Sequence, residues 1–155
     1  MDETRPYQLL FVCTANICRS PMAEGLALSY AQRRGWSVEC QSGGIMGLID
    51  KHAASNAVRA LREINIDISG HRSQGITPEM VEWADHILVM ELRHAIKLRE
   101  RHDNLGTKVL QLGSFGGLVE VDDPVGGWRW RFRRSRGDIQ RCVEAFMDNL
   151  PPRLR

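Results

Sequence analysis

Cys13 and Arg19 frame the part of this 155-residue sequence that is best suited to chemistry. Cys13 ends an apolar run, and Arg19 stands directly before Ser20-Pro21, a typical helix start. A loop between a strand and a helix points backbone N–H groups into one hollow, which binds a tetrahedral oxyanion and stabilises a thiolate. A guanidinium adds two parallel donors that suit phosphate oxygens. The segment therefore predicts a nucleophilic cysteine in an anion-binding loop.

A simpler interpretation of Cys13 is a small buried hydrophobic residue at a strand end. Arg19, Ser20 and the strand–loop–helix context favour the nucleophile instead. The loop contains no glycine, so Asn16 is the residue expected to adopt a left-handed conformation. The segment lacks the Gly-Lys-Ser/Thr ending of a nucleotide-binding loop, which excludes that class.

Segments with strand and helix patterns alternate along the chain. Strands are predicted over residues 7–12, 36–42, 86–90 and 108–112. Helices are predicted over residues 22–34, 55–64, 78–83, 91–101 and 137–150, the first with Ser20 as its cap and Gly35 as its stop. Strands separated by helices imply right-handed crossovers. We therefore expect one α/β domain over residues 1–155, with three α/β/α layers, a mostly parallel four-stranded sheet and the phosphate-binding loop after its first strand.

The bulk composition is that of an ordinary globular protein, with 43% hydrophobic and 26% charged residues. A net charge of +2 is too small to argue for nucleic acid. The N-terminus does not resemble a signal peptide, and no apolar run approaches the roughly 20 residues that span a bilayer. Four cysteines are too few for a disulfide scaffold, and no Cys/His spacing suggests zinc. These features predict a cytoplasmic protein without membrane insertion or metal.

Residues 13–21 (CTANICRSP) resemble the signature loop of the bacterial low-molecular-weight protein tyrosine phosphatases. Further similarities follow in the family's order: the turn at 42–44 (SGG), the strand at 84–90 (ADHILVM) and the Asp-Pro loop at 123–127 (DPVGG). The resemblance extends from residue 9 to residue 150. It implies a phosphatase that hydrolyses phosphotyrosine in proteins through a cysteinyl-phosphate intermediate.

The resemblance assigns the nucleophile to Cys13, phosphoryl binding to Arg19 and the general acid to Asp123. Asp122 is the neighbouring rival for the acid, and an Asp-Pro pair can also simply open a turn. No cofactor or metal is expected, because Arg19 and the loop amides carry the charge. The phosphate-binding loop would consist of Thr14, Ala15, Asn16, Ile17, Cys18 and Ser20 around the nucleophile.

The family also implies supporting and redox roles. Residues matching Ser42 and His71 join Asn16 and Ser20 in a hydrogen-bonded network that holds the loop. The cysteine matching Cys18 can trap the oxidised nucleophile as a disulfide, although a small buried residue would explain it equally well. Ser20 is expected to donate a hydrogen bond to the sulfur of the nucleophile.

The cleft departs from the family at its walls. Val125 and the loop that contains Leu48 are apolar, whereas many relatives carry aromatic residues at these walls. The Asp-Pro-x-Gly-Gly form also resembles a branch with phosphoarginine phosphatases, in which a threonine in the signature loop helps to select the substrate. Ile17 occupies that place here and favours an aryl ester. Because of the Asp-Pro-x-Gly-Gly form, phosphoarginine hydrolysis remains an alternative.

Two further alternatives share the scaffold. Arsenate reduction of the thioredoxin-coupled kind needs more cysteines, and none lies between Cys40 and Cys142. A non-catalytic phosphate-binding module would not need the complete set of Cys13, Arg19 and Asp123. The expected partner is a phosphorylated protein, and the expected oligomeric state is a monomer or weak dimer.

Basic and aromatic residues alternate over 128–136 (WRWRFRRSR). Such a stretch can bind nucleic acid, acidic peptides or anionic membranes. We favour the exposed start of the last helix with partly buried aromatic rings, and we expect no nucleic-acid partner.

Overall fold

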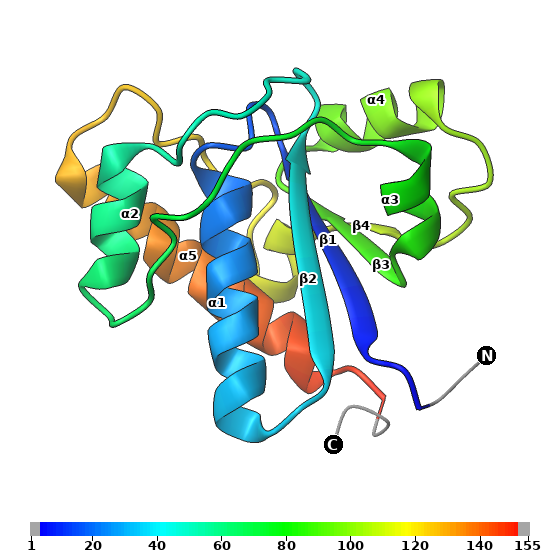
Figure 1. Ribbon diagram of the computed structural model, residues 1–155, viewed down its shortest axis with the longest axis horizontal. Coiled ribbons are helices and arrows are strands. Elements are labelled where there is room, and N and C mark those ends of the chain that lie inside the picture. The colour runs from blue at the N-terminus through cyan, green and yellow to red at the C-terminus, as the bar shows by residue number, and fades with distance from the viewer. Residues whose placement is uncertain (1–3, 152–155) are drawn as a thin grey trace.

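The computed structural model describes residues 4–151 and contains a four-stranded parallel sheet between two layers of helices (Figure 1). The strands are β1 (Tyr7–Cys13), β2 (Val38–Gly44), β3 (His86–Val89) and β4 (Val109–Gln111), in the spatial order β2-β1-β3-β4. All three strand pairs are parallel. The predicted α/β fold with its phosphate-binding loop after the first strand is thereby confirmed.

Helices cover both faces of the sheet. One layer holds α1 (Arg19–Arg34), α2 (Ser55–Arg62) and α5 (Arg129–Asp148), and the other holds α3 (Pro78–Trp83) and α4 (Leu92–Arg101). Side chains of β1 alternate between the two cores: Leu9, Phe11 and Cys13 face the α1 side, while Leu10 and Val12 face the α3 side. The strand reads as a continuous apolar run because both of its faces are covered.

The first helix begins earlier than its sequence pattern predicts. Helix α1 starts at Arg19, and the position before it, Cys18, makes no side-chain capping bond. The prediction that Ser20 caps this helix is therefore wrong. Ser20 lies inside the first turn, where its hydroxyl is engaged with the loop rather than with the helix end.

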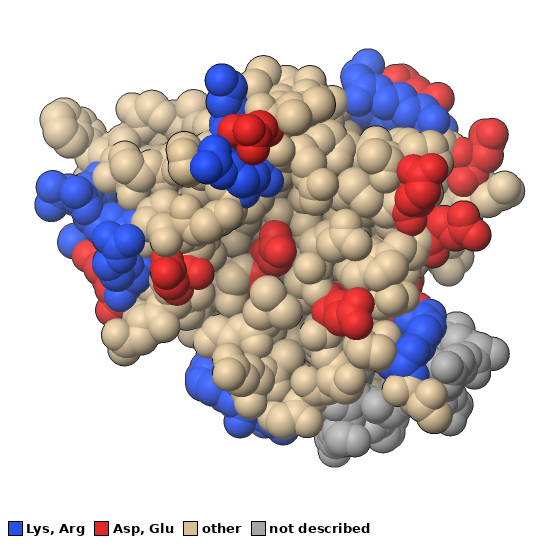
Figure 2. All heavy atoms as spheres, viewed as in Figure 1, with Lys and Arg blue, Asp and Glu red and all other residues tan. Residues whose placement is uncertain are grey.

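The last helix also differs from its prediction, which began at residue 137. Helix α5 starts at Arg129, because Phe132 is buried in the core and Arg133 and Arg136 pair with Glu63 beside α2. The stretch 128–136 is thus the start of the last helix, with Trp128 79% exposed. In Figure 2, basic side chains gather at the edge of the molecule where α2 and the start of α5 lie in Figure 1.

The remaining differences are short shifts at element ends. The prediction over 108–112 ran one residue into a 3-10 helix, Leu112–Gly116, which follows β4. Within residues 4–151 no helix is long and apolar enough to cross a membrane.

Candidate active site

Cys13 is the last residue of β1, and its side chain lines a cavity of about 190 Å³ beyond the end of the sheet. The sulfur is nearly buried, with 3% of the residue exposed. The cavity lining comprises Cys13, Thr14, Ala15, Ile17, Cys18, Arg19, Met46, Asp123 and Val125. The signature loop therefore lines an open cavity at the place where parallel sheets bind ligands.

Asn16 shapes the loop through a left-handed backbone conformation, with φ of 60°. Its backbone N–H donates to the Cys13 sulfur at 3.3 Å. Its carbonyl lies 2.7 Å from the His71 ring nitrogen Nε2. The expected left-handed conformation at this residue is confirmed. Because the peptide turns here, a backbone donor points at the sulfur rather than along a strand.

The Asn16 side chain joins the loop to two serines. Its Nδ2 donates to Ser20 Oγ at 2.8 Å and to Ser42 Oγ at 2.9 Å. Ser20 Oγ also lies 2.9 Å from Cys13 Sγ. Because Ser20 already accepts from Asn16, its own proton is available to the sulfur. The structure thus brings all four residues of the expected network, Asn16, Ser20, Ser42 and His71, together around the loop.

Two further residues of this network escaped the sequence analysis. Gln74 donates its backbone N–H to Asn16 Oδ1 at 3.0 Å, and Ser42 donates to Glu24 Oε1 at 2.5 Å. Burial raises the pKa of Glu24, against the opposing effects of the Ser42 bond and the His71 charge. In the sequence, only the position of Glu24 one turn beyond Ser20 on the predicted helix indicates that it could reach this network.

Arg19 is only 1% exposed, and hydrogen bonds hold its guanidinium in place. Its Nη1 donates to Glu91 Oε2 at 2.7 Å and to the Val121 carbonyl at 2.8 Å, and its Nη2 donates to Thr14 Oγ1 at 3.2 Å. A buried guanidinium is tolerated only with partners of this kind. The guanidinium is therefore fixed beside the cavity before any anion arrives.

Glu91 and His94 are functional candidates that the sequence analysis placed only on a charged helix. Glu91 follows β3 and precedes α4, so it stands at the same edge of the sheet as Cys13. Burial disfavours its charge, but hydrogen bonds and charges from Arg93 and Arg19 outweigh this and lower the pKa to about 2. Its position at the carboxyl end of a parallel strand was the signal that could have identified it.

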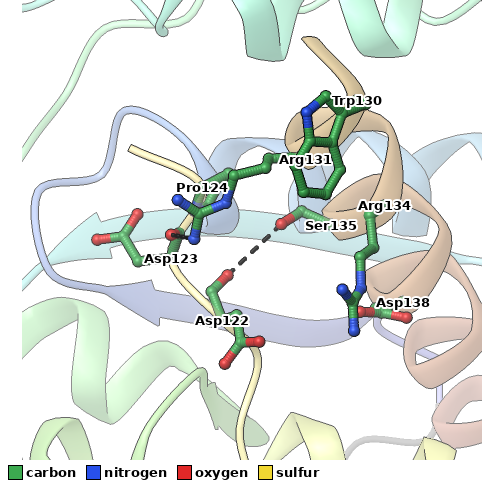
Figure 3. Close-up of a pocket in the computed structure, with 8 residues that line it drawn as sticks. All are labelled: Asp122, Asp123, Pro124, Trp130, Arg131, Arg134, Ser135 and Asp138. Atoms are coloured by element: carbon green, nitrogen blue, oxygen red, sulfur yellow. Dashed lines mark hydrogen bonds between the residues drawn. The ribbon is translucent and has the colours of Figure 1, made fainter. Parts of the chain in front are cut away.

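Asp123 approaches Arg19 from the loop before α5, with Oδ2 3.5 Å from Nη2. The loop is held by α5: Arg131 Nη2 donates to the Asp123 carbonyl at 3.2 Å, and Ser135 Oγ donates to the Asp122 carbonyl at 3.5 Å (Figure 3). Asp123 lines both the Cys13 cavity and the small cavity drawn in Figure 3, whereas Asp122 lines only the latter. The structure thus brings Asp123, and not its neighbour, to the Cys13 cavity.

Part of the cavity wall is apolar. Val125 is 52% exposed and Met46 is 64% exposed, and both line the cavity with Ile17. From the loop that was expected to supply Leu48 as a wall, Met46 is the residue that lines this cavity. Neither wall carries an aromatic ring, in agreement with the sequence.

Cys18 belongs to the loop and lines the cavity, and only 3% of the residue is exposed. Burial, followed by the negative charges of Asp123 and Cys13, raises its pKa to about 12, and Arg19 only partly opposes this. Cys18 is therefore a neutral thiol near the nucleophile at physiological pH. All four cysteines of the chain are free.

Comparison with known proteins agrees with this geometry. The family model described as "Low molecular weight phosphotyrosine protein phosphatase" matches residues 8–154. A protein-arginine-phosphatase of Geobacillus stearothermophilus is 34% identical over 94% of this chain and 97% of its own length. A probable low molecular weight protein-tyrosine-phosphatase, EpsP of Ralstonia solanacearum, is 35% identical over 95% of each chain.

A solved structure supports the same assignment. The low molecular weight protein tyrosine phosphatase from T. tengcongensis superposes with a TM-score of 0.89 at 31% identity, covering 93% of this chain and 99% of that one. The agreement extends over the whole sheet and both helical layers rather than over one motif. The chain belongs to the low-molecular-weight protein tyrosine phosphatase family.

Proposed function

We propose that the protein hydrolyses phosphotyrosine in phosphorylated proteins through a cysteinyl-phosphate intermediate. The observation that carries this proposal is one cavity lined by a thiol, a buried guanidinium and a carboxyl group, those of Cys13, Arg19 and Asp123. Together these groups supply a nucleophile, a cation that binds the phosphoryl oxygens and a group that transfers protons.

In the first step, the Cys13 thiolate attacks phosphorus, and the bond to the ester oxygen breaks as the sulfur–phosphorus bond forms. Arg19 and the backbone amides of residues 14–19 hold the three non-bridging oxygens. Asp123 gives its proton to the departing oxygen, which leaves as the neutral phenol.

In the second step, ionised Asp123 takes a proton from water as the water oxygen attacks phosphorus. The sulfur–phosphorus bond breaks, inorganic phosphate forms and Cys13 returns as a thiolate. Ser20 supports this step, because its hydroxyl lies 2.9 Å from the sulfur and can stabilise the returning negative charge.

Phosphoarginine hydrolysis is the second candidate, because relatives that cover most of the chain carry the name protein-arginine-phosphatase. Ile17 lines the cavity and offers the substrate no hydroxyl. We therefore expect phosphotyrosine to be preferred. Rates on phosphotyrosine, phosphoarginine and phosphoserine peptides of one sequence decide the question, and faster phosphoarginine turnover would reverse the assignment.

Two variants test the mechanism itself. Cys13→Ser should abolish turnover of an aryl phosphate. Asp123→Asn should lower kcat/KM, which reports the first step, by about 10²–10⁴-fold for a poor leaving group such as phenol, and by much less for p-nitrophenol, which leaves without a proton. Turnover retained by Cys13→Ser would refute the scheme.

Further properties follow from the same proposal. The free cysteines suit a reducing cytoplasm, where Cys18 would resolve an oxidised Cys13 as a disulfide. The protein is proposed to act as a monomer or weak dimer, which light scattering over a concentration series measures.

A further inference from the structure

The side-chain oxygen of Thr14 is contacted by three nitrogen atoms. Arg93 Nη2 lies at 2.7 Å, His94 Nε2 at 3.0 Å and Arg19 Nη2 at 3.2 Å. A guanidinium carries hydrogen-bond donors only. Neither arginine can therefore accept the hydroxyl proton of Thr14.

The hydrogen-bond geometry of His94 makes the third nitrogen a donor as well. The backbone N–H of Glu91 points at His94 Nδ1 at 3.1 Å, and because a backbone N–H can only donate, Nδ1 holds a lone pair. The ring is fully buried, and burial together with the Arg19 charge lowers its pKa to about 4. At neutral pH the single ring proton of His94 is thus on Nε2, which donates to Thr14.

The Thr14 hydroxyl proton consequently has no acceptor among residues 4–151. The two lone pairs of the oxygen are shared among these three donors, and Thr14 lines the same cavity as Cys13 and Asp123. Thr14 Oγ1 is 3.2 Å from Arg19 Nη2, so the hydroxyl stands beside the guanidinium that is proposed to bind the anion.

We infer that the Thr14 hydroxyl donates to an oxygen of the bound phosphoryl group, and that Arg93 and His94 turn its proton toward the cavity. This inference rests on the proposed function, since it adds a side-chain donor to the same site. It also explains why the start of α4 is tied to the loop: Glu91 holds the Arg93 guanidinium and the His94 ring in place. Arg93 and His94 are positioning residues, and Thr14 is the group that touches the anion.

The test measures anion binding without turnover. Iodoacetamide alkylates Cys13, inorganic phosphate protects it, and mass spectrometry follows the modified fraction across a phosphate series. Thr14→Val removes the hydroxyl and leaves the side-chain shape nearly unchanged. We expect the phosphate concentration that gives half-protection to rise about tenfold, because one hydrogen bond to a charged group is lost. Thr14→Ser keeps the hydroxyl and should restore most of the affinity.

Controls separate a lost donor from a damaged loop. Without phosphate, Thr14→Val should alkylate at Cys13 at the wild-type rate, because an intact loop presents the same sulfur. If that variant does not fold, Thr14→Ala supplies the same comparison. The inference would be overturned if the variant without the hydroxyl were half-protected at a phosphate concentration within twofold of the wild-type value. It would also be overturned if Thr14→Ser bound phosphate as weakly as Thr14→Val.

The assigned imidazole tautomer provides a second test. In ¹⁵N spectra of the imidazole at pH 7, His94 should carry its proton on Nε2. A proton on Nδ1 would leave Nε2 as an acceptor for Thr14 and overturn the inference. Failure of the proposed function looks different: the wild-type protein would then be protected by phosphate but would not hydrolyse an aryl phosphate.

Discussion

Glu91 Oε2 lies 2.7 Å from Nη1 of Arg19 and forms an ion pair with a guanidinium that is 1% exposed. Arg19 begins α1 on one face of the sheet, and Glu91 directly precedes α4 on the other. The pair therefore joins the two helical layers across the carboxyl ends of β1 and β3. Removing one partner of such a pair leaves a buried charge without compensation.

Glu91→Gln should weaken both stability and catalysis. The amide keeps the shape but loses the negative charge, so the unfolding free energy should fall by about 3 kcal/mol. We also expect kcat/KM for p-nitrophenyl phosphate to fall about tenfold, because a guanidinium misplaced by a fraction of an ångström stabilises the transition state less. Glu100→Gln, on the exposed side of α4, is the matched control. Unchanged kinetics in Glu91→Gln would show that Arg19 keeps its orientation unaided.

The same carboxylate should make stability depend on acid pH. Its pKa in the folded protein, about 2, is below the usual value of 4.5, so its contribution is complete above pH 4.5 and is lost as pH falls toward 2. The difference in melting temperature between wild type and Glu91→Gln should therefore be largest at neutral pH and shrink below pH 4.5. A constant difference from pH 7 to pH 3 would contradict this.

Ser20→Ala should slow the second chemical step more than the first. The hydroxyl that faces the Cys13 sulfur stabilises the returning thiolate, and its loss should lower kcat about tenfold while the phosphoenzyme accumulates. Burst kinetics with p-nitrophenyl phosphate measure both rates. The idea fails if the burst amplitude and kcat match those of wild type.

Cys18→Ser should remove protection against oxidation. Peroxide should inactivate the wild-type protein reversibly, because the neutral thiol of Cys18 condenses with a sulfenic acid on Cys13 and releases water. The variant should regain much less activity after treatment with dithiothreitol. Equal recovery in both proteins would assign Cys18 a packing role alone.

Arg131→Glu should lower kcat about fivefold, because the side chain donates to the Asp123 carbonyl and its loss releases the acid loop. Arg129→Glu carries the same charge change at the first residue of α5, whose side chain makes no hydrogen bond to the loop within residues 4–151, and it should leave kcat on a small aryl phosphate within twofold. If both variants lose activity equally, the charge of the helix start rather than the loop contact is responsible.

Much of the fold could be predicted from local patterns in the sequence. The apolar run before Cys13 predicted a central strand, since a parallel strand is buried on both faces. The stretch 128–136 was favoured as the exposed start of the last helix, but the helical pattern itself was predicted only from residue 137, because the arginines and tryptophans before it look like solvent-exposed sequence. Phe132 packing into the core and the Arg133 and Arg136 pairs with Glu63 extend that helix, and these are contacts with segments distant in the sequence.

The sequence alone determined the chemistry of the loop, because Cys13, Asn16, Arg19 and Ser20 are close along the chain and their spacing already specifies an anion hollow beside a thiol. Only the tertiary structure decided what holds that loop in place. Glu91 reaches the site from the position before α4, His94 from the first turn of α4, and Gln74 from the segment before α3. The sequence of the loop itself does not indicate these partners, since the parallel sheet brings strand ends together that are far apart in sequence.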